Sequence, residues 1–180
     1  MLQITVPALE GWDESKQEFV DYKAQTLQLE HSLIAISKWE SKWHKPFLVK
    51  EQKTREETLD YIKCMTITQN VDPNVYNRLT QDNIDEINAY IDDPMTATTF
   101  SDEQNGKPSR EIITSELIDY WMIANNIPVE YRKWHLNRLI TLIKICSIKN
   151  APPKKQSKQD ILRRNAALNA ERRKRLNSKG

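Results

Sequence analysis

The stretch from residue 112 to residue 148 constrains the fold of this chain most, because two helical patterns meet there at Pro128. In residues 128–148, mostly apolar side chains recur at intervals of three and four on two neighbouring faces. They are Tyr131, His135, Arg138 or Leu139, Leu142 and Cys146 on one face, and Leu136, Leu139 or Ile140, and Ile143 on the next. At about 1.5 Å per residue, a helix of these 21 residues would span roughly 31 Å, the diameter of a small domain. We therefore expect this segment to be the central core helix.

The composition favours a folded, mainly helical protein. Of 180 residues, 38% are hydrophobic and only three are glycine, so few positions relax the backbone. We predict a mainly α fold, with a compact helical domain, a short N-terminal β-hairpin and a basic C-terminal helical arm. The predicted divisions are residues 1–28, a β-rich segment packed on the body; residues 29–149, the helical core domain; and residues 150–180, a Pro-Pro linker and a helical or disordered arm.

The N-terminal segment is the β-rich part of the chain. Apolar and polar residues alternate in residues 2–6 and again around residues 19–22, and Pro7, Gly11 and Asp13 lie between them. This pattern predicts a β-hairpin or two short strands.

A helical pattern follows in residues 29–43 and ends at Pro46. Trp39 and Trp43 lie one turn apart on one face of this expected helix. Large aromatic side chains contribute much of the burial in a small core, so we favour core anchors over a partner surface for these two indoles.

Capping signals indicate where further helices begin. The hydroxyl of Thr54 can accept a backbone hydrogen bond while Glu57, three residues later, reaches back to the cap. Asp72 followed by Pro73 fits a cap with proline in the first turn, and Thr80 indicates another start. These signals predict a series of short helices.

The clearest internal loop is the polar, Gly- and Pro-containing segment 95–110. Ser109 or Thr114 then caps the first helix of the 112–148 stretch, and Asn125 and Asn126 indicate its end before Pro128. Because few residues join them, we expect the two helices to form an antiparallel pair or a sharp corner.

The charge of the chain is split between its two parts. Residues 149–180 hold eleven basic and two acidic residues, a net charge of +9, which leaves 16 basic and 23 acidic residues, or −7, for residues 1–148. Three interpretations of the basic arm remain open: a solvated, partly disordered terminus, sequence-independent nucleic-acid binding, and attachment to an acidic protein surface such as a second copy of the body. Its candidate partner-binding residues are Arg163, Arg164, Arg172, Arg173, Lys174 and Arg175.

No pattern in the chain points to catalysis, a cofactor or a metal. His31, His44 and His135 are far apart, and no Cys or His pair has zinc spacing. Three glycines could hardly build a phosphate loop, and adjacent carboxylates on helices usually mark a solvated face. We expect Cys64 and Cys146 to be buried free thiols. Because no catalytic pattern is present, we expect that the protein is not an enzyme. No apolar run is long enough to cross a membrane, so we expect a cytoplasmic protein.

Five strings together resemble the tail assembly chaperones of long-tailed bacteriophages. They are LEHSLIAISKWESKWHKPF at 29–47, PMTATTF at 94–100, SELIDYWMI at 115–123, KWHLNRL at 133–139 and NAALN at 165–169. The resemblance implies a non-enzymatic protein that coats the tape measure protein, keeps it soluble and helps to recruit tail-tube subunits, with the major tail protein as a further partner. It also implies a location in the cytoplasm of the infected host and absence from the mature virion.

A chaperone of this kind needs apolar grooves that accept amphipathic helices through anchors at i, i+3 and i+4. Trp39, Trp43, Trp121 and Trp134 are the candidates to line such grooves, although we prefer a core role for at least two of the four. The resemblance transfers no catalytic or ligand-binding residue. The alternatives are a nucleic-acid-associated phage protein that uses residues 149–180 and a structural head or neck component of the virion.

Overall fold

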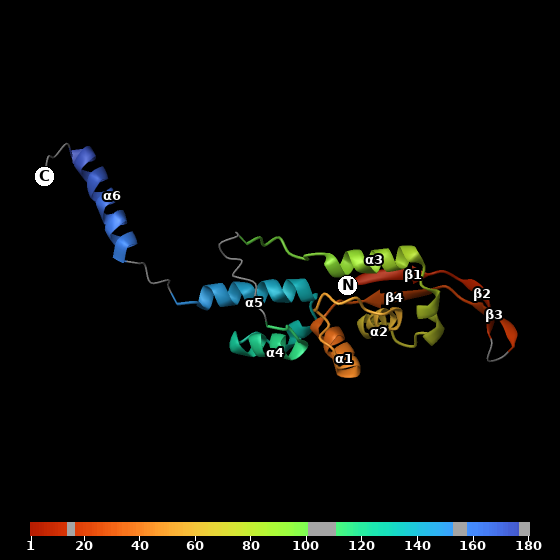
Figure 1. Ribbon diagram of the computed structural model, residues 1–180. Coiled ribbons are helices and arrows are strands. Elements are labelled where there is room, and N and C mark those ends of the chain that lie inside the picture. The colour runs from red at the N-terminus through yellow and green to blue at the C-terminus, as the bar shows by residue number, and fades with distance from the viewer. Residues whose placement is uncertain (14–16, 101–110, 153–157, 177–180) are drawn as a thin grey trace. The chain divides into compact units, whose positions relative to one another are not determined.

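The computed structural model describes residues 1–13, 17–100, 111–152 and 158–176 (Figure 1). The chain divides into two compact units, Met1–Ile148 and Lys149–Gly180, which are described separately below. The chain is mainly helical, and its N-terminal unit is a compact mixed α/β body. Within the described residues, no helix is both long enough and apolar enough to cross a membrane.

The N-terminal strands form one antiparallel hairpin with a break in the middle. Strand β1 (Leu2–Val6) pairs with β4 (Gln25–Leu29), and β2 (Leu9–Asp13) pairs with β3 (Glu18–Tyr22). In both ladders the two residue numbers of every pair add to 31, as in Leu2 with Leu29 and Leu9 with Tyr22. The register therefore continues unchanged across the break at residues 7–8 and 23–24. A hairpin is present, as predicted, but Gly11 and Asp13, which we placed between the strands, lie in β2, and residues 2–6 pair with β4 rather than with residues 19–22.

Two capped helices follow the hairpin. Helix α1 (Leu33–Trp43) begins after Ser32, whose hydroxyl accepts a hydrogen bond from the amide of Ala35. The predicted start at Leu29 is wrong, because Leu29 pairs with Leu2 in the β1–β4 ladder. Helix α2 (Arg55–Met65) has the predicted capping box between Thr54 and Glu57.

The predicted starts at Asp72 and Thr80 are also confirmed. Asp72 caps the 3-10 helix η1 (Pro73–Arg78), and Thr80 caps α3 (Gln81–Asp92) in a box with Asn83. The Asn83 amide also donates to the carbonyl of Thr5 at 3.4 Å, which attaches α3 to β1. Figure 1 shows α3 on one side of the β1–β4 ladder and α1 and α2 on the other.

The predicted helix over 128–148 is wrong in its first third. Helix α4 (Ser115–Ala124) is capped by Thr114, and a short 3-10 helix, η3 (Val129–Lys133), precedes α5 (Leu136–Asn150). The backbone is extended between η3 and α5 because His135 forms a β-bridge with Ser32 and the next amide, of Leu136, donates to the His31 carbonyl at 2.7 Å. This long-range pairing outweighs the local helical periodicity.

The core centres on the β1–β4 ladder and on α1, and α5 is only one of its walls, which corrects the expected central role of residues 128–148. The fully buried side chains from the ladder and α1 include Val6, Leu27, Leu29, Leu33, Ile36 and Trp39; α2 adds Ile62 and Met65; and α3, α4 and α5 add Ile87, Ile118, Leu136 and Leu139. The strands alternate, so Ile4, Val6, Leu27 and Leu29 all point into this core.

The C-terminal unit contains helix α6 (Lys158–Leu176), and the side chains described in it are exposed. The candidate cap Ser109 and most of the predicted loop 95–110 lie outside the described residues. Cys64 and Cys146 are free thiols as predicted, but both are half-buried where we expected burial.

Candidate functional site

The two buried histidines, His31 and His135, are structural. The ring of His31 is 2% exposed; its Nδ1 lies 2.6 Å from the hydroxyl of Tyr61, and its centroid is 5.1 Å from that of His135. Burial, with the nearby His135 as a second cause, lowers the pKa of His31 to about 3. His135 lies directly before α5, and its Nε2 hydrogen-bonds the carbonyl of Tyr90 at 3.0 Å.

This pair therefore has the polar contacts of a satisfied core, with no open position for a substrate. Within the residues that the structure describes, no group of three His, Cys, Asp or Glu side chains could hold a metal ion.

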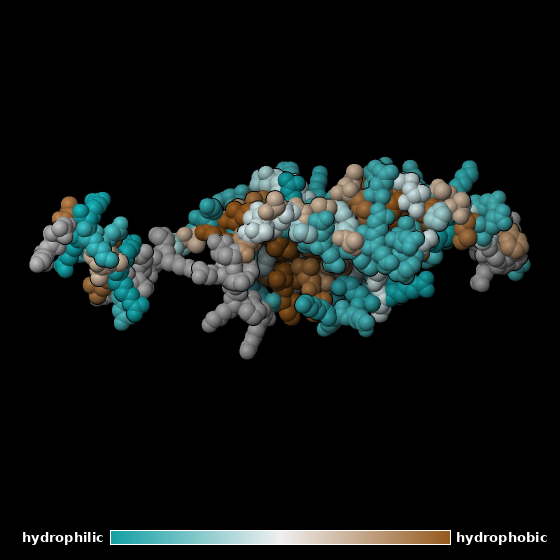
Figure 2. All heavy atoms as spheres, turned by 90° about the horizontal axis from the view of Figure 1, so that it is seen from above, coloured by the Kyte–Doolittle hydropathy of each residue, from teal (hydrophilic) through white to brown (hydrophobic). Residues whose placement is uncertain are grey.

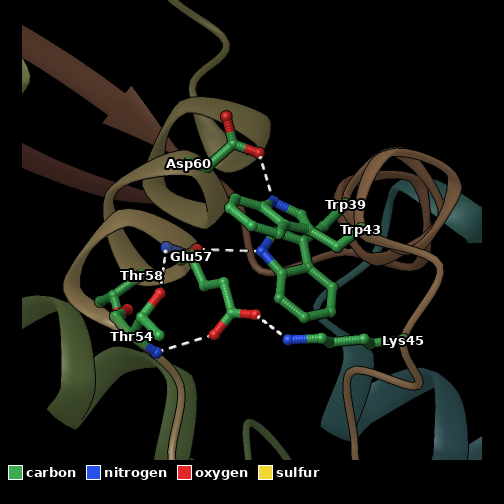
Figure 3. A network of polar contacts seen from close by, with 7 residues as sticks. All are labelled: Trp39, Trp43, Lys45, Thr54, Glu57, Thr58 and Asp60. Atoms are coloured by element: carbon green, nitrogen blue, oxygen red, sulfur yellow. Dashed lines mark hydrogen bonds and ion pairs between the residues drawn. The ribbon is translucent and has the colours of Figure 1, made fainter.

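The first two candidate tryptophans are bound to α2 through their indole nitrogens (Figure 3). The Nε1 of Trp39 donates to the carbonyl of Glu57 at 2.9 Å, and the Nε1 of Trp43 donates to the carboxylate of Asp60 at 2.9 Å. The two rings stack with centroids 6.1 Å apart. Trp39 is 1% exposed and is a core residue, whereas Trp43 is half-buried at the edge of the core.

The Glu57 carboxylate joins the loop before α2 to the end of α1. One oxygen accepts the backbone N–H of Thr54 at 2.7 Å, and the other pairs with Lys45 at 2.6 Å (Figure 3). The Lys45 hydrogen bond, followed by the Thr54 amide, lowers the pKa of Glu57. The capping box predicted from sequence is thus also a tertiary contact.

A second buried carboxylate, Glu40 on α1, sets the position of α4. Its Oε1 accepts the backbone N–H of Phe47 at 2.8 Å, and its Oε2 accepts the backbone N–H of Ser115 at 2.8 Å. Ser115 is the first residue of α4, where helical amides lack partners within the helix and favour a negative charge. Glu40 therefore fixes the start of α4 against α1.

Helix α4 has an inner face in the core and a second apolar face that nothing in the described structure covers. Ile118 and Met122 are buried, whereas Tyr120 and Ile123, one turn apart, are 62% and 74% exposed. Exposed apolar residues also flank the helix, Ile112 before it and Val129 in η3. We call Ile112, Tyr120, Ile123 and Val129 the α4 face. Figure 2 shows hydrophobic residues gathered in the region of α4 and α5.

The middle of α4 is held to η3, and a side-chain cap closes its C-terminal end. The Asp119 carboxylate pairs with Arg132 at 3.0 Å, and the Asn125 amide donates to the carbonyl of Trp121 at 2.9 Å. Burial raises the pKa of Asp119, with Arg132 opposing that shift. Exposed apolar side chains on a rigid element are typical of a protein-binding site, and α4 is anchored at its start by Glu40 and at its middle by Arg132.

The remaining candidate tryptophans are half-buried beside α4 and α5. Trp121 packs against the core from α4. Trp134 stacks on Tyr131 with centroids 4.1 Å apart, and the Arg138 guanidinium lies 4.1 Å from its ring centroid. The four tryptophans predicted as groove residues thus lie in two places, on α1 against α2 and around α4 and η3.

Helix α6 exposes its cationic side chains. Helix α6 carries the predicted partner-binding residues on exposed positions, namely Arg163, Arg164, Arg172, Arg173, Lys174 and Arg175. The described part of this unit also exposes four large apolar side chains, Ile161, Leu162, Leu168 and Leu176. Helix α6 therefore has positive charge that could pair with an acidic partner, and its described side chains bury very little surface.

Sequence reasoning missed the α4 face. Periodicity assigns Leu117, Ile118, Trp121 and Met122 to one broad apolar surface, and Tyr120 and Ile123 then read as its continuation. The number of apolar residues could have revealed this face. Residues 117–123 are apolar at every position except Asp119, and one buried helix face requires fewer apolar residues than that.

No protein-family model, no curated protein and no solved structure matches this chain.

Proposed function

We propose that this protein is a phage tail assembly chaperone that binds the tape measure protein and assists tail-tube assembly through protein–protein contacts. The observation that carries the proposal is the α4 face, a set of exposed apolar side chains on and beside a helix that Glu40 ties to α1 at its start and the Asp119–Arg132 pair ties to η3 at its middle. The resemblance of residues 29–47, 115–123 and 133–139 to such chaperones supports the same function.

The chemistry of the α4 face suits a helical client. Tyr120 and Ile123 are separated by one turn, and an amphipathic helix offers matching apolar anchors at i, i+3, i+4 and i+7. Aromatic side chains such as Tyr120 are common binding hot spots because they bury a large area with few rotatable bonds. In this proposal the client stays soluble because its own apolar stripe is covered, and no chemical step is needed.

Co-expression with the long helical phage protein encoded nearby tests the proposal. We expect the client to become soluble with the unaltered chain and to lose solubility with Tyr120→Gln/Ile123→Gln. A matched control, Leu9→Gln/Ile67→Gln, removes two apolar side chains of similar exposure elsewhere in the same unit and should leave the client soluble. A client that gains no solubility from the unaltered chain would contradict the proposal.

The proposed location is the cytoplasm of the infected host, with the major tail protein as a further partner. A chaperone leaves the finished tail, whereas a structural head or neck component stays in it. Immunodetection in purified virions therefore separates the two functions, and a stoichiometric amount in virions would exclude the chaperone.

A second candidate function, nucleic-acid association, is favoured by the exposed cations of α6. Cations that neutralise phosphates release counterions, so binding to a duplex should weaken steeply with salt. Replacing Arg172, Arg173, Lys174 and Arg175 by Gln removes four charges and should lower the slope of log K against log salt by up to about 3.6. Binding that is absent, or that keeps its salt slope in this variant, would exclude the candidate.

A further inference from the structure

A second surface of the N-terminal unit has the features of a binding groove. It lies between α2, η1 and α3 and has a volume of about 310 Å³. Its apolar lining comes from Leu59, Tyr76, Leu79 and Ile84, of which Leu59, Leu79 and Ile84 are only partly buried against the core. This volume is at the small end for ligand sites, so it suits a few side chains better than a cofactor. We call it the α2–α3 groove.

Two cations line the α2–α3 groove, and its lining contains no acidic residue. They are Lys53, just before the α2 cap, and Arg55, the first residue of α2. Within the described residues, neither cation has an ion pair or a hydrogen bond. The polar residues Thr58, Asn77 and Gln81 complete the lining, so the groove is mixed in polarity and positively charged in a unit whose net charge is −7.

Lys53 is half-buried and lies between the groove and a second hollow that contains Glu51 and Glu57. Its ammonium lies 4.3 Å from the ring centroid of Phe47 and 5.8 Å from that of Trp39. Partial burial is the main reason that the pKa of Lys53 is lowered, and Glu57 and Glu51 oppose the shift. Glu57 forms its ion pair with Lys45, and within the described residues no ion pair joins Lys53 to Glu57 or to Glu51.

We propose that the α2–α3 groove binds an acidic amphipathic helix of a partner protein. Its apolar side chains would pack on Leu59, Leu79 and Ile84, and its carboxylates would pair with Lys53 and Arg55. The groove runs between two helices, which is a common seat for a third helix. A carboxylate is the favoured anion because it supplies the acceptor that the partly desolvated ammonium lacks.

The proposal is separate from the proposed function, since the α2–α3 groove and the α4 face share no residue. The probe is a synthetic amphipathic helix with leucines at i, i+3, i+4 and i+7 and glutamates beside them. A second peptide replaces every glutamate by glutamine. Fluorescence polarisation with the full chain should show binding of the glutamate peptide that is at least about tenfold tighter than binding of the glutamine peptide, because two charge pairs contribute on the order of a factor of ten.

Lys53→Met/Arg55→Gln should weaken the glutamate peptide roughly tenfold and leave the glutamine peptide unchanged. Methionine keeps the apolar stem of Lys53 over the aromatic rings. The control Lys23→Gln/Lys50→Met removes the same charge from exposed residues outside the groove and should have little effect. Equal weakening by both pairs would show a general charge effect and overturn the site.

A variant that adds negative charge to the groove tests whether weaker binding in Lys53→Met/Arg55→Gln comes from misfolding. Thr58→Glu places a carboxylate at the groove from a half-buried position on α2, where glutamate is a good helix former. It should weaken the glutamate peptide and not the glutamine peptide. Full displacement of the peptide by succinate would mean that the groove takes a free carboxylate and would overturn the helical partner. Client solubility that depends on Tyr120 and Ile123 but not on Lys53 would leave the proposed function intact.

Discussion

The helices of the two units differ in how many tertiary contacts stabilise them. In the N-terminal unit each of α1, α2, α3 and α4 is capped by a Ser or Thr side chain and buries one face against the β1–β4 ladder or a neighbouring helix. In the C-terminal unit α6 is longer than any of them, yet every described side chain is exposed.

In this chain the length of a helix does not determine how well it is stabilised. Isolated helices are marginal in water, and most helical stability in proteins comes from packing an apolar face. The N-terminal unit meets that condition and α6 does not. We therefore expect α6 to gain most of its order from a partner.

Truncating one leucine in each unit gives the largest contrast. Leu29 is fully buried in β4, so Leu29→Ala should cost about 2–5 kcal/mol of unfolding free energy, because it removes buried apolar surface and leaves a cavity. Leu168→Ala on α6 should change it by less than about 0.5 kcal/mol. All five tryptophans lie in residues 1–148, so urea denaturation followed by tryptophan fluorescence reports that unit alone. Equal effects of both substitutions would mean that the units fold as one.

Acid should destabilise the N-terminal unit through His31. Its pKa is about 3 in the folded state against 6.5 ordinarily, so the unfolded chain binds more protons between these values. Stability is therefore complete above pH 6.5 and is lost progressively as the pH falls towards 3, by on the order of a few kcal/mol.

The measurement is the free energy of unfolding from pH 7.5 to pH 5, where most carboxylates stay ionised. His31→Gln should be less stable than the unaltered chain at pH 7.5 but should show a flatter pH dependence. His44→Asn alters an exposed histidine at the left-handed end of α1, where asparagine is tolerated, and should keep the original slope. An unchanged slope in His31→Gln would refute the assignment.

Glu40→Gln should have an intermediate effect. The amide keeps the shape but has one acceptor oxygen, so one of the amides of Phe47 and Ser115 loses its partner at a cost of about 1–3 kcal/mol. Glu130→Gln, on an exposed residue of η3, is the matched control and should change little. Hydrogen exchange should show faster exchange at the start of α4 in Glu40→Gln. Unchanged protection there would mean that Glu40 does not anchor this helix.

The smallest expected effect on stability comes from the α4 face. Tyr120→Gln/Ile123→Gln should change the unfolding free energy by less than about 0.5 kcal/mol per residue, because both side chains are already mostly in water. The same pair should abolish client solubilisation. A large loss of stability would show that this face packs within the body and would remove it as a binding surface.

Local chemistry in the sequence predicted much of the fold. Thr54 with Glu57, Asp72 with Pro73, and Thr80 each identified a helix start, because a cap depends on residues within one turn. The predictions failed where distant pairing decides the backbone. Leu29 has helical spacing to Leu33 but belongs to β4, since its partner is Leu2.

The same limit explains the result for the candidate site. His135 has helical spacing to the apolar residues that follow it, but it lies in a β-bridge to Ser32. The spacing of residues along the sequence gives no information about such a long-range pairing. Trp39 is buried and Tyr120 is exposed, although both sit in apolar helical strings. Periodicity shows which side chains are apolar, whereas the tertiary packing decides which of them are covered.

The constant register of the hairpin has a consequence for how this protein can vary. Because paired residues add to 31 on both sides of the break, shortening β2 and β3 by equal amounts would leave every partner in β1 and β4 unchanged. If β2 and β3 changed in length by amounts that differ by one residue, the pairing of β1 with β4 would shift by one residue. Ile4 and Val6 of β1 would then turn away from the core. The outer hairpin is thus free to change length in matched steps, and relatives of this chain should differ there by even numbers of residues.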